Sequence, residues 1–197
     1  MSTNGVAGLL LAAGTSARMG RNKMLLDLGG ETVLRRAARR AIDGGLHPLI
    51  VVLGAQAARA EHELGGLECQ VATNPHYESG MTSSMHCGLA ALPTTTAAAM
   101  VLLADMPFVT ADMIGEMVRR YQQTAARLVI SDYEGVNAPP MLFDKHLFGE
   151  LQATHGERCG REVVQRHLDD AEVFRWPASA LADLDVPEDY ERLTHAG

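Results

Sequence analysis

Short apolar runs alternate with amphipathic stretches along almost the whole chain. Continuous apolar runs bounded by Gly, Pro, Asn or Asp are typical of strands buried on both faces of a parallel sheet. The stretches between them repeat their apolar residues at the spacing of helices with one buried side. The pattern therefore predicts an α/β fold, a mostly parallel sheet with helices on both faces, formed as one domain over residues 1–197.

The same alternation gives the expected elements. We predict strands at residues 6–11, 49–53, 69–73, 100–104, 128–131, 141–143 and 172–176. We predict helices at residues 31–42, 55–64, 82–92, 110–123, 144–152, 161–168 and 187–193. Paired glycines such as Gly44 and Gly45 predict turns between these elements.

Composition excludes several kinds of partner. Asp and Glu outnumber Lys and Arg by 24 to 17, so the net charge of -7 repels a polyanion and no nucleic-acid partner is expected. The three cysteines form no Cys-x-x-Cys pair, which fits reduced thiols in a cytoplasmic protein. The apolar stretch at residues 6–13 is too short to span a bilayer, so no membrane partner is expected.

Four arginines, at positions 35, 36, 39 and 40, lie opposite the apolar stripe of the helix expected at residues 31–42. An anion site is one interpretation of such a cluster. Because the chain offers no wider basic stripe to join them, a solvated helix face is the prediction.

A loop of small residues follows the first expected strand and closes with cations. The residues of interest are Leu11, Ala12, Ala13, Gly14, Arg18, Gly20 and Lys23. Gly14 and Gly20 permit close backbone approach, and Arg18 and Lys23 can neutralise phosphate charge. The spacing matches neither a P-loop nor the Gly-x-Gly-x-x-Gly of dinucleotide binders. An ordinary strand-to-helix turn is the alternative interpretation.

A second motif runs from Asn74 to Ser84, directly after the strand expected at residues 69–73. Asn74 can present both a donor and an acceptor to a base edge, and Ser83 and Ser84 offer hydroxyls to ribose or phosphate. Gly80 permits backbone to approach a ligand there. A simple helix N-cap would also select serine at this place.

Two acidic motifs predict a metal site. Asp105 follows a buried strand, at the sheet edge where ligands of open α/β sheets bind, and its carboxylate suits Mg²⁺. Near the chain's end, Asp183 and Asp185 alternate on one strand-like face. We take Asp185 as the second metal ligand, with Asp183 as the alternative.

Together these motifs resemble the nucleotidyltransferases that attach a nucleotide to molybdopterin, especially the molybdenum cofactor cytidylyltransferases. The resemblance covers nearly the whole chain and implies a single Rossmann-like, GT-A-like nucleotidyltransferase domain. It implies that the Asn74 motif is the base and ribose site and that Asp105 binds magnesium. In that family Ala12-Ala13-Gly14 is typical of cytidylyl transfer, and two glycines there are typical of guanylyl transfer.

The resemblance also implies an acceptor site. Residues 135–144 are similar to the family's Gly-x-x-Gly-x-Pro-x-Leu-Phe stretch, with Pro140 at the shared proline and Asn137 as a candidate contact. The usual Gly-Asn/His before that proline is Ala138-Pro139 here, so the pterin contacts do not transfer residue by residue. Arg161 resembles the arginine of a second family turn and could hold the acceptor's terminal phosphate; a solvated arginine is the alternative.

The expected reaction is therefore transfer of CMP from CTP to the phosphate of a molybdopterin-type acceptor, with release of pyrophosphate. Arg18, Lys23 and Asp105 are the expected catalytic residues, and Asp105 and Asp185 the Mg²⁺ ligands. The alternatives are GTP as donor, a smaller acceptor such as a sugar phosphate, or a non-catalytic protein that delivers the finished cofactor. Transient docking to a molybdenum enzyme is compatible with either role.

Overall fold

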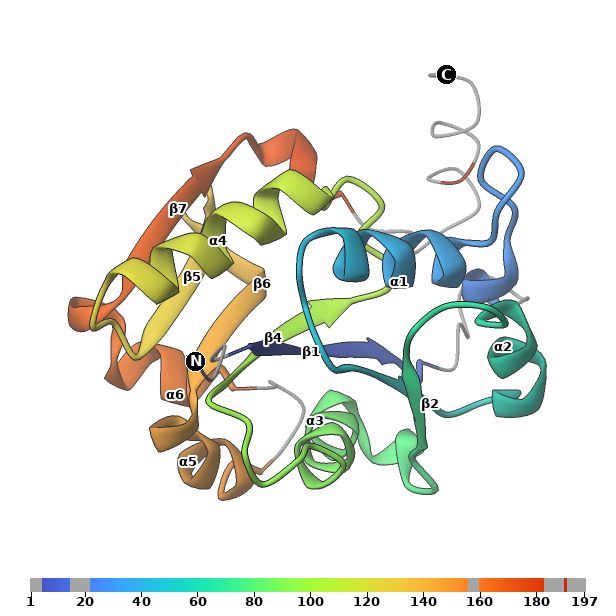
Figure 1. The fold of residues 1–197 in the computed structure, drawn as a ribbon, viewed down its shortest axis with the longest axis horizontal. Helices are drawn as coiled ribbons and strands as arrows, with labels where there is room; N and C mark the ends of the chain where they lie inside the picture. The colour runs from blue at the N-terminus through green and yellow to red at the C-terminus, as the bar shows by residue number, and fades with distance from the viewer. Residues whose placement is uncertain (1–4, 15–21, 156–159, 183–189, 191–197) are drawn as a thin grey trace.

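A mixed sheet organises the chain, of which the computed structural model describes residues 5–14, 22–155, 160–182 and 190. Within these residues seven strands pair in the order β3-β2-β1-β4-β6-β5-β7 (Figure 1). All neighbours are parallel except β6, which is antiparallel to both β4 and β5. The strands are β1 (Val6–Ala12), β2 (Leu49–Leu53), β3 (Gln70–Thr73), β4 (Ala98–Leu103), β5 (Leu128–Tyr133), β6 (Val136–Asp144) and β7 (Glu172–Trp176).

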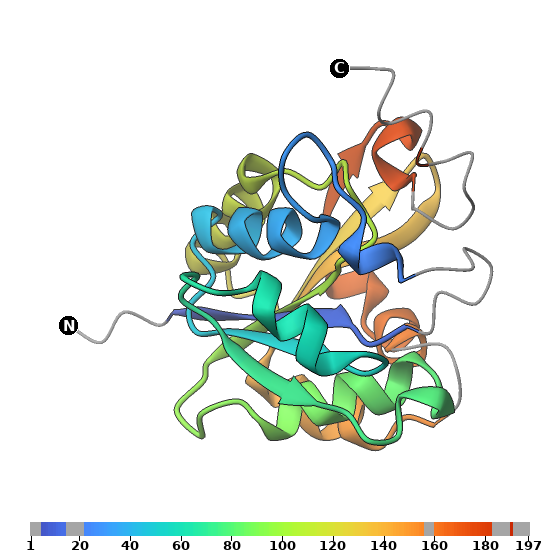
Figure 2. The ribbon, with the colours of Figure 1, turned by 90° about the vertical axis from the view of Figure 1, so that its right-hand side faces the viewer.

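Helices cover both faces of the sheet (Figures 1 and 2). Figure 1 shows α1 and α4 above the sheet and α3, α5 and α6 below it. None of the helices in the described ranges has the length and apolar character needed to cross a membrane. The helices are α1 (Val33–Asp43), α2 (Ala57–Glu63), α3 (Met81–Ala90), α4 (Ala111–Gln123), α5 (Phe148–Gln152) and α6 (Arg161–Arg166).

The central strand β1 shows how the sequence builds two cores. Its side chains point alternately to the two faces of the sheet. Val6 and Leu10 pack in the cluster between the sheet and helices α1 and α4. Ala7 and Leu9 pack in the cluster between the sheet and helices α3, α5 and α6. All four are at most 1% exposed, which explains why this strand has no polar alternation in its sequence.

The predicted α/β architecture is confirmed, and the differences lie at element ends. Strands β2 and β7 have the predicted bounds, but β6 is much longer than the predicted 141–143. The first half of β6 contains two prolines, which are unusual within a strand. This half is nevertheless a strand, because β5 continues to pair with it beyond a register shift at Ile130/Ser131. Residues Lys145–Leu147 form a 3-10 helix, so α5 begins only at Phe148. The helix predicted at 187–193 lies outside the described residues except for residue 190.

The prediction of a solvated arginine face on α1 is wrong for three of its four arginines. Arg35, Arg36 and Arg40 each donate hydrogen bonds to backbone carbonyls of neighbouring segments. Arg39 alone matches the prediction, since it is 47% exposed and pairs with Glu31 at the surface. Helical periodicity separates the apolar side from the polar side, but the loops that fold back onto the polar side follow from the tertiary structure.

Candidate active site

An ion pair lies where strands β1 and β4 end. These parallel neighbours are in register at Leu11 and Leu103, so their carboxyl ends reach the same edge of the sheet. Lys23 begins a 3-10 helix (Lys23–Leu25). Its Nζ donates to Oδ2 of Asp105 at 2.6 Å, and the two side chains are 11% and 21% exposed. The structure thus brings together two predicted catalytic residues that are 82 positions apart in sequence.

The Asp105 carboxylate is also the candidate metal ligand among the described residues. It is partly exposed at the sheet edge, where a ligand can reach it. The described ranges contain no group of three or more His, Cys, Asp or Glu side chains that could hold a metal. This arrangement fits Mg²⁺, which binds through one or two carboxylates and completes its shell with water and substrate phosphates. Asp183 and Asp185 lie outside the described residues.

The end of β1 leads the backbone to the surface beside this pair. Leu11, Ala12 and Ala13 are buried, whereas Gly14 is exposed and a Cβ on it would meet no atom of the described residues within 4 Å. A ligand can therefore approach the backbone at Gly14. The predicted Arg18 and Gly20 lie outside the described residues.

Gly54 also shapes this edge of the sheet, although none of the sequence motifs described above contains it. It follows β2, and a Cβ on it would lie 2.6 Å from the carbonyl oxygen of Ala13 and 2.7 Å from Cβ of Tyr77. The segments after β1 and β2 can approach this closely only because residue 54 has no side chain. In the sequence, the feature that could have indicated this close approach is a glycine directly after a buried strand.

Asn74 is buried, and both its amide nitrogen and its amide oxygen make hydrogen bonds within the protein. It is 3% exposed, and its Nδ2 donates to the hydroxyls of Ser83 at 2.9 Å and Ser84 at 3.1 Å. Its Oδ1 accepts the backbone N–H of His76 at 2.9 Å. In this arrangement Asn74 ties the segment after β3 to the start of α3, and its contact with a base stays a prediction.

The first turn of α3 has no side-chain cap. Its N-cap is Gly80, with φ of 95°, and no side-chain capping bond is found there in the described part of the chain. The Ser83 hydroxyl is directed instead at the carbonyl oxygens of Gly80 and His76, at 2.8 and 2.9 Å. The alternative of a serine N-cap is therefore wrong. A helix start without a side-chain acceptor suits an anionic ligand, because its N–H groups point outward.

A cavity of about 470 Å³ opens between α3, β4, β6 and α6. Its size is within the range of small-molecule sites, which is about 300–1,000 Å³. Predicted acceptor residues Asn137 and Arg161 line it, but Pro140 is buried and its neighbour Pro139 lines the cavity instead. The lining is mostly apolar and includes Met81, Met85, Val101, Leu103, Val136, Ala138, Met141, Phe143 and Val164.

Two hydroxyl groups hold the Pro139–Pro140 segment of β6, which forms part of the cavity wall. The Tyr133 hydroxyl donates to the carbonyl of Pro139 at 2.9 Å, and burial raises the pKa of Tyr133 to about 12. The Ser131 hydroxyl donates to the carbonyl of Pro140 at 2.9 Å. Prolines have no N–H and both carbonyls are occupied, so this wall presents an apolar surface to the cavity.

Comparison with known proteins gives the family. Residues 8–171 match the MobA-like NTP transferase domain. The chain is 32% identical over 173 residues to a protein named nicotine blue oxidoreductase from Paenarthrobacter nicotinovorans, covering 82% of this chain and 81% of the relative. It is also 32% identical over 205 residues to a probable molybdenum cofactor guanylyltransferase from Opitutus terrae, covering 98% of this chain and 97% of the relative.

Solved structures agree in fold. Rv0371c from Mycobacterium tuberculosis superimposes with a TM-score of 0.83 at 25% identity, over 97% of this chain and 98% of that one. A structure of Rv0371c in complex with manganese superimposes with a TM-score of 0.78 at 24% identity, over 98% of this chain and all of that one. The sheet order, the Lys23–Asp105 pair at its carboxyl edge and the match over residues 8–171 lead to one conclusion. This chain belongs to the family of MobA-like NTP transferase domains.

Proposed function

We propose that this chain transfers CMP from CTP to the phosphate of a molybdopterin-type acceptor and releases pyrophosphate. An oxygen of the acceptor phosphate forms a bond to the α-phosphorus of CTP, and the bond from that phosphorus to the β-phosphate bridging oxygen breaks. The attacking group is already anionic, so the protein has to align two phosphates and offset their charge rather than remove a proton. The observation that carries the proposal is the Lys23–Asp105 pair at the carboxyl edge of the sheet.

Lys23 offsets the charge of the triphosphate in this reaction. Its ammonium already lies at the sheet edge, 2.6 Å from Asp105, and is mostly shielded from solvent. When nucleotide binds, the phosphate oxygens compete with Asp105 for this ammonium, and the carboxylate becomes available as a ligand. Arg18, Gly20 and the exposed backbone at Gly14 complete the phosphate site in the proposal. Leu11, Ala12 and Ala13 form the buried end of β1 from which this site starts.

Asp105, with Asp185, would hold Mg²⁺, which supplies positive charge at the α-phosphate as bonds form and break. The partial exposure of the Asp105 side chain and its contact with Lys23 support this role. The manganese complex of Rv0371c is consistent with a divalent ion in a related fold. Asn74 contributes by fixing Ser83 and Ser84 at the start of α3. In the proposal, the first N–H groups of this helix, after Gly80, face the nucleotide.

The cavity between α3 and α6 takes the acceptor in this proposal. It adjoins both nucleotide motifs, because Met81 directly follows Gly80 and Leu103 lies two residues before Asp105. Arg161 is the charged side chain that lines it and would bind the acceptor's phosphate. The apolar walls suit the flat face of a ring system, and Asn137 and Gln165 offer polar contacts to its edge.

Thermal shift with the four nucleoside triphosphates and Mg²⁺ tests the donor. CTP is expected to raise the melting temperature most, since a ligand at 100 times its Kd adds about 2.7 kcal/mol of stability. Asp105→Asn should abolish the part of this shift that depends on Mg²⁺, and Asp112→Asn, an exposed acid at the start of α4, should not. With molybdopterin added, Asp105→Asn should slow pyrophosphate release by about 10²–10³-fold. No nucleotide response in the wild type would exclude the proposal.

GTP is the second candidate donor. Two relatives, from Opitutus terrae and Rhizobium johnstonii, are named as molybdenum cofactor guanylyltransferases, whereas Ala12-Ala13 favours cytidine in the sequence. Selective stabilisation by GTP in the same assay would decide for guanylyl transfer. Stoichiometric binding of the finished cofactor without pyrophosphate release would indicate a delivery protein instead. We place the reaction in the cytoplasm.

A further inference from the structure

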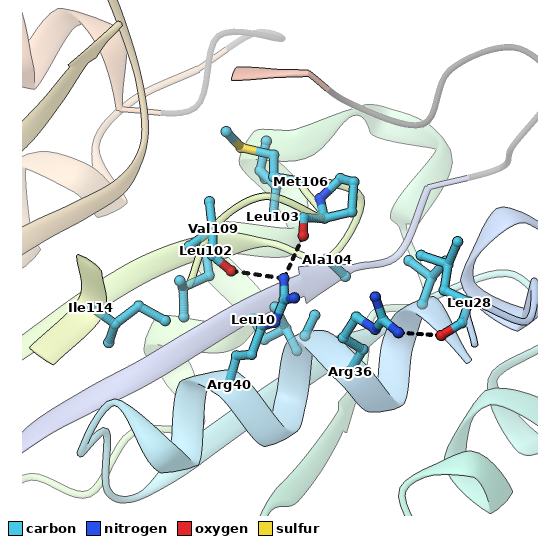
Figure 3. A pocket seen from close by; sticks show the side chains of 13 residues that line it. Leu10, Leu28, Arg36, Arg40, Leu102, Leu103, Ala104, Met106, Val109 and Ile114 are labelled. Carbon is cyan, nitrogen blue, oxygen red and sulfur yellow. Dashed lines mark hydrogen bonds between the residues drawn. The ribbon is translucent and has the colours of Figure 1, made fainter. Parts of the chain in front are cut away.

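Arg40 reaches from α1 to the loop that follows β4. Its Nη1 donates to the carbonyl oxygens of Pro107 and Val109, the second at 3.1 Å (Figure 3). This loop begins at Ala104 and contains Asp105. A side chain near the end of α1 is thus bonded to the segment that carries the candidate metal ligand.

Among the described residues, the backbone of this loop has few short hydrogen bonds around Asp105. At its start, the Ala104 N–H donates to Leu11 at 3.1 Å, which ties it to β1. Further along, the Met106 N–H donates to Leu103 at 3.4 Å and the Val109 N–H to Met106 at 3.3 Å, both long for such bonds. The Asp105 side chain is held by Lys23, while the backbone on its two sides is anchored to β1 at Ala104 and to α1 by Arg40.

The charge of Arg40 has no acidic partner in the described part of the chain. Its hydrogen bonds go to the two carbonyl oxygens, and no ion pair to Arg40 is found among the described residues. Burial lowers the pKa of this guanidinium, the neighbouring Arg36 and Arg39 lower it further, and Glu31 opposes them. A guanidinium nevertheless stays protonated in proteins, so it donates charge-assisted bonds to both carbonyls.

Both bonds come from one nitrogen of the guanidinium, Nη1, which donates to the two carbonyl oxygens. A lysine ammonium can also donate twice, but from a point charge on a more flexible stem, so it should hold the loop less firmly. Beside the guanidinium lies a cavity of about 20 Å³, between α1 and the loop, large enough for about one water molecule. Shortening Arg40 would enlarge this space and free the loop to move into it.

We propose that Arg40 is a positioning residue that holds Asp105 in place for metal binding by anchoring its loop to α1. The inference rests on the proposed role of Asp105 as a ligand. Partners that orient metal ligands typically contribute about 10–100-fold in metal affinity. Arg40 would act through the loop and touch neither metal nor nucleotide.

Mn²⁺ binding and amide hydrogen exchange together test the proposed role of Arg40. Arg40→Met should weaken Mn²⁺ binding in the presence of CTP by about 10-fold or more, measured by paramagnetic resonance, and leave the affinity for metal-free CTP within about twofold. Amide exchange in residues 104–110 should speed up. Arg40→Lys should restore part of the Mn²⁺ affinity. Arg39 lies on the same helix at an exposed position and pairs with Glu31 and Asp43 in the described residues, so Arg39→Met should change neither readout.

The outcomes separate this inference from the proposed function. Unchanged Mn²⁺ affinity and unchanged loop exchange in Arg40→Met, or an equal loss of metal-free CTP binding, would overturn the role of Arg40. If the wild type binds Mn²⁺ with neither CTP nor GTP, the proposed function fails. Amide hydrogen exchange in residues 104–110 still decides in that case whether Arg40 holds the loop. If Arg40→Met does not fold, Arg40→Lys carries the test, with an intermediate loss of Mn²⁺ affinity expected and an unchanged affinity contradicting the role.

Discussion

At the scale of single residues, Asp144 shows how one carboxylate links three elements. It ends β6 and accepts the Tyr121 hydroxyl of α4 at 2.6 Å, the backbone N–H of His146 at 2.9 Å, and the His146 ring. Burial alone would raise the pKa of Asp144, but these three donors outweigh it and lower the pKa below its ordinary value. The ionised form is therefore favoured by folding.

This shift predicts a pH-dependent stability. Because the folded pKa is the lower one, the stabilisation is fully present above the ordinary carboxyl pKa of about 3.9 and is lost as pH falls through the folded pKa. Asp144→Asn should cost about 1–2 kcal/mol in urea unfolding at neutral pH, and less below about pH 3. Glu68→Gln, an exposed site before β3, should cost little at either pH. A deficit of equal size at both pH values would contradict the assignment.

At the scale of elements, the contact between α1 and α4 depends on Gly44. This residue ends α1, and a Cβ on it would lie 2.5 Å from Cγ2 and 2.7 Å from Cβ of Ile114 on α4. Its φ of -75° is ordinary for any residue, so the requirement is one of space and not of backbone conformation. The sequence indicated a turn at Gly44-Gly45, but a local pattern does not reveal which helix packs against it.

Gly44→Ala should therefore destabilise the fold by about 1–3 kcal/mol through overpacking, measured by urea unfolding. Gly149→Ala is the matched control, because it lies within α5 and its Cβ would meet no atom within 4 Å. Alanine is the better helix former, so that variant should leave stability unchanged or raise it by up to about 1 kcal/mol. Equal effects of the two substitutions would show that helix contact is not the reason for Gly44.

At the scale of the whole molecule, a buried series of hydrogen bonds joins strands β7, β5 and β6, which lie next to one another at one end of the sheet. Trp176 on β7 donates through Nε1 to the hydroxyl of Ser131 on β5 at 3.0 Å, and that hydroxyl donates to the carbonyl of Pro140 on β6. Ser131 is fully buried, so water cannot replace either bond. These bonds connect the edge strand β7 to the part of β6 next to Pro139, which lines the cavity.

Ser131→Ala should lower the free energy of unfolding by about 1–3 kcal/mol, because it leaves the Trp176 N–H and the Pro140 carbonyl without this partner. The measurement is urea denaturation followed by Trp176 fluorescence, since this is the single tryptophan of the chain. Ser179→Ala, at an exposed position after β7, should have almost no effect. A loss below about 0.5 kcal/mol in Ser131→Ala would argue against this series of bonds as a stabilising feature.

The sequence by itself determined the architecture and the candidate chemistry of this protein. Alternating apolar and amphipathic segments fix which residues must be buried, and burial on both faces requires a sheet between helices. The positions of Lys23 and Asp105 after their strands also followed, because parallel strands end at one edge. These features depend on local spacing, which one sequence contains in full.

Only the tertiary structure decided where polar side chains bind. Arg40 has the same local pattern as Arg39, yet it reaches the loop of Asp105 while Arg39 stays at the surface. The sequence offers the Asn74 amide as a donor, but only the structure shows that it donates to Ser83 and Ser84. The physical reason is that a donor bonds to whichever acceptor the packed elements bring within about 3 Å, and the sequence pattern does not encode that distance.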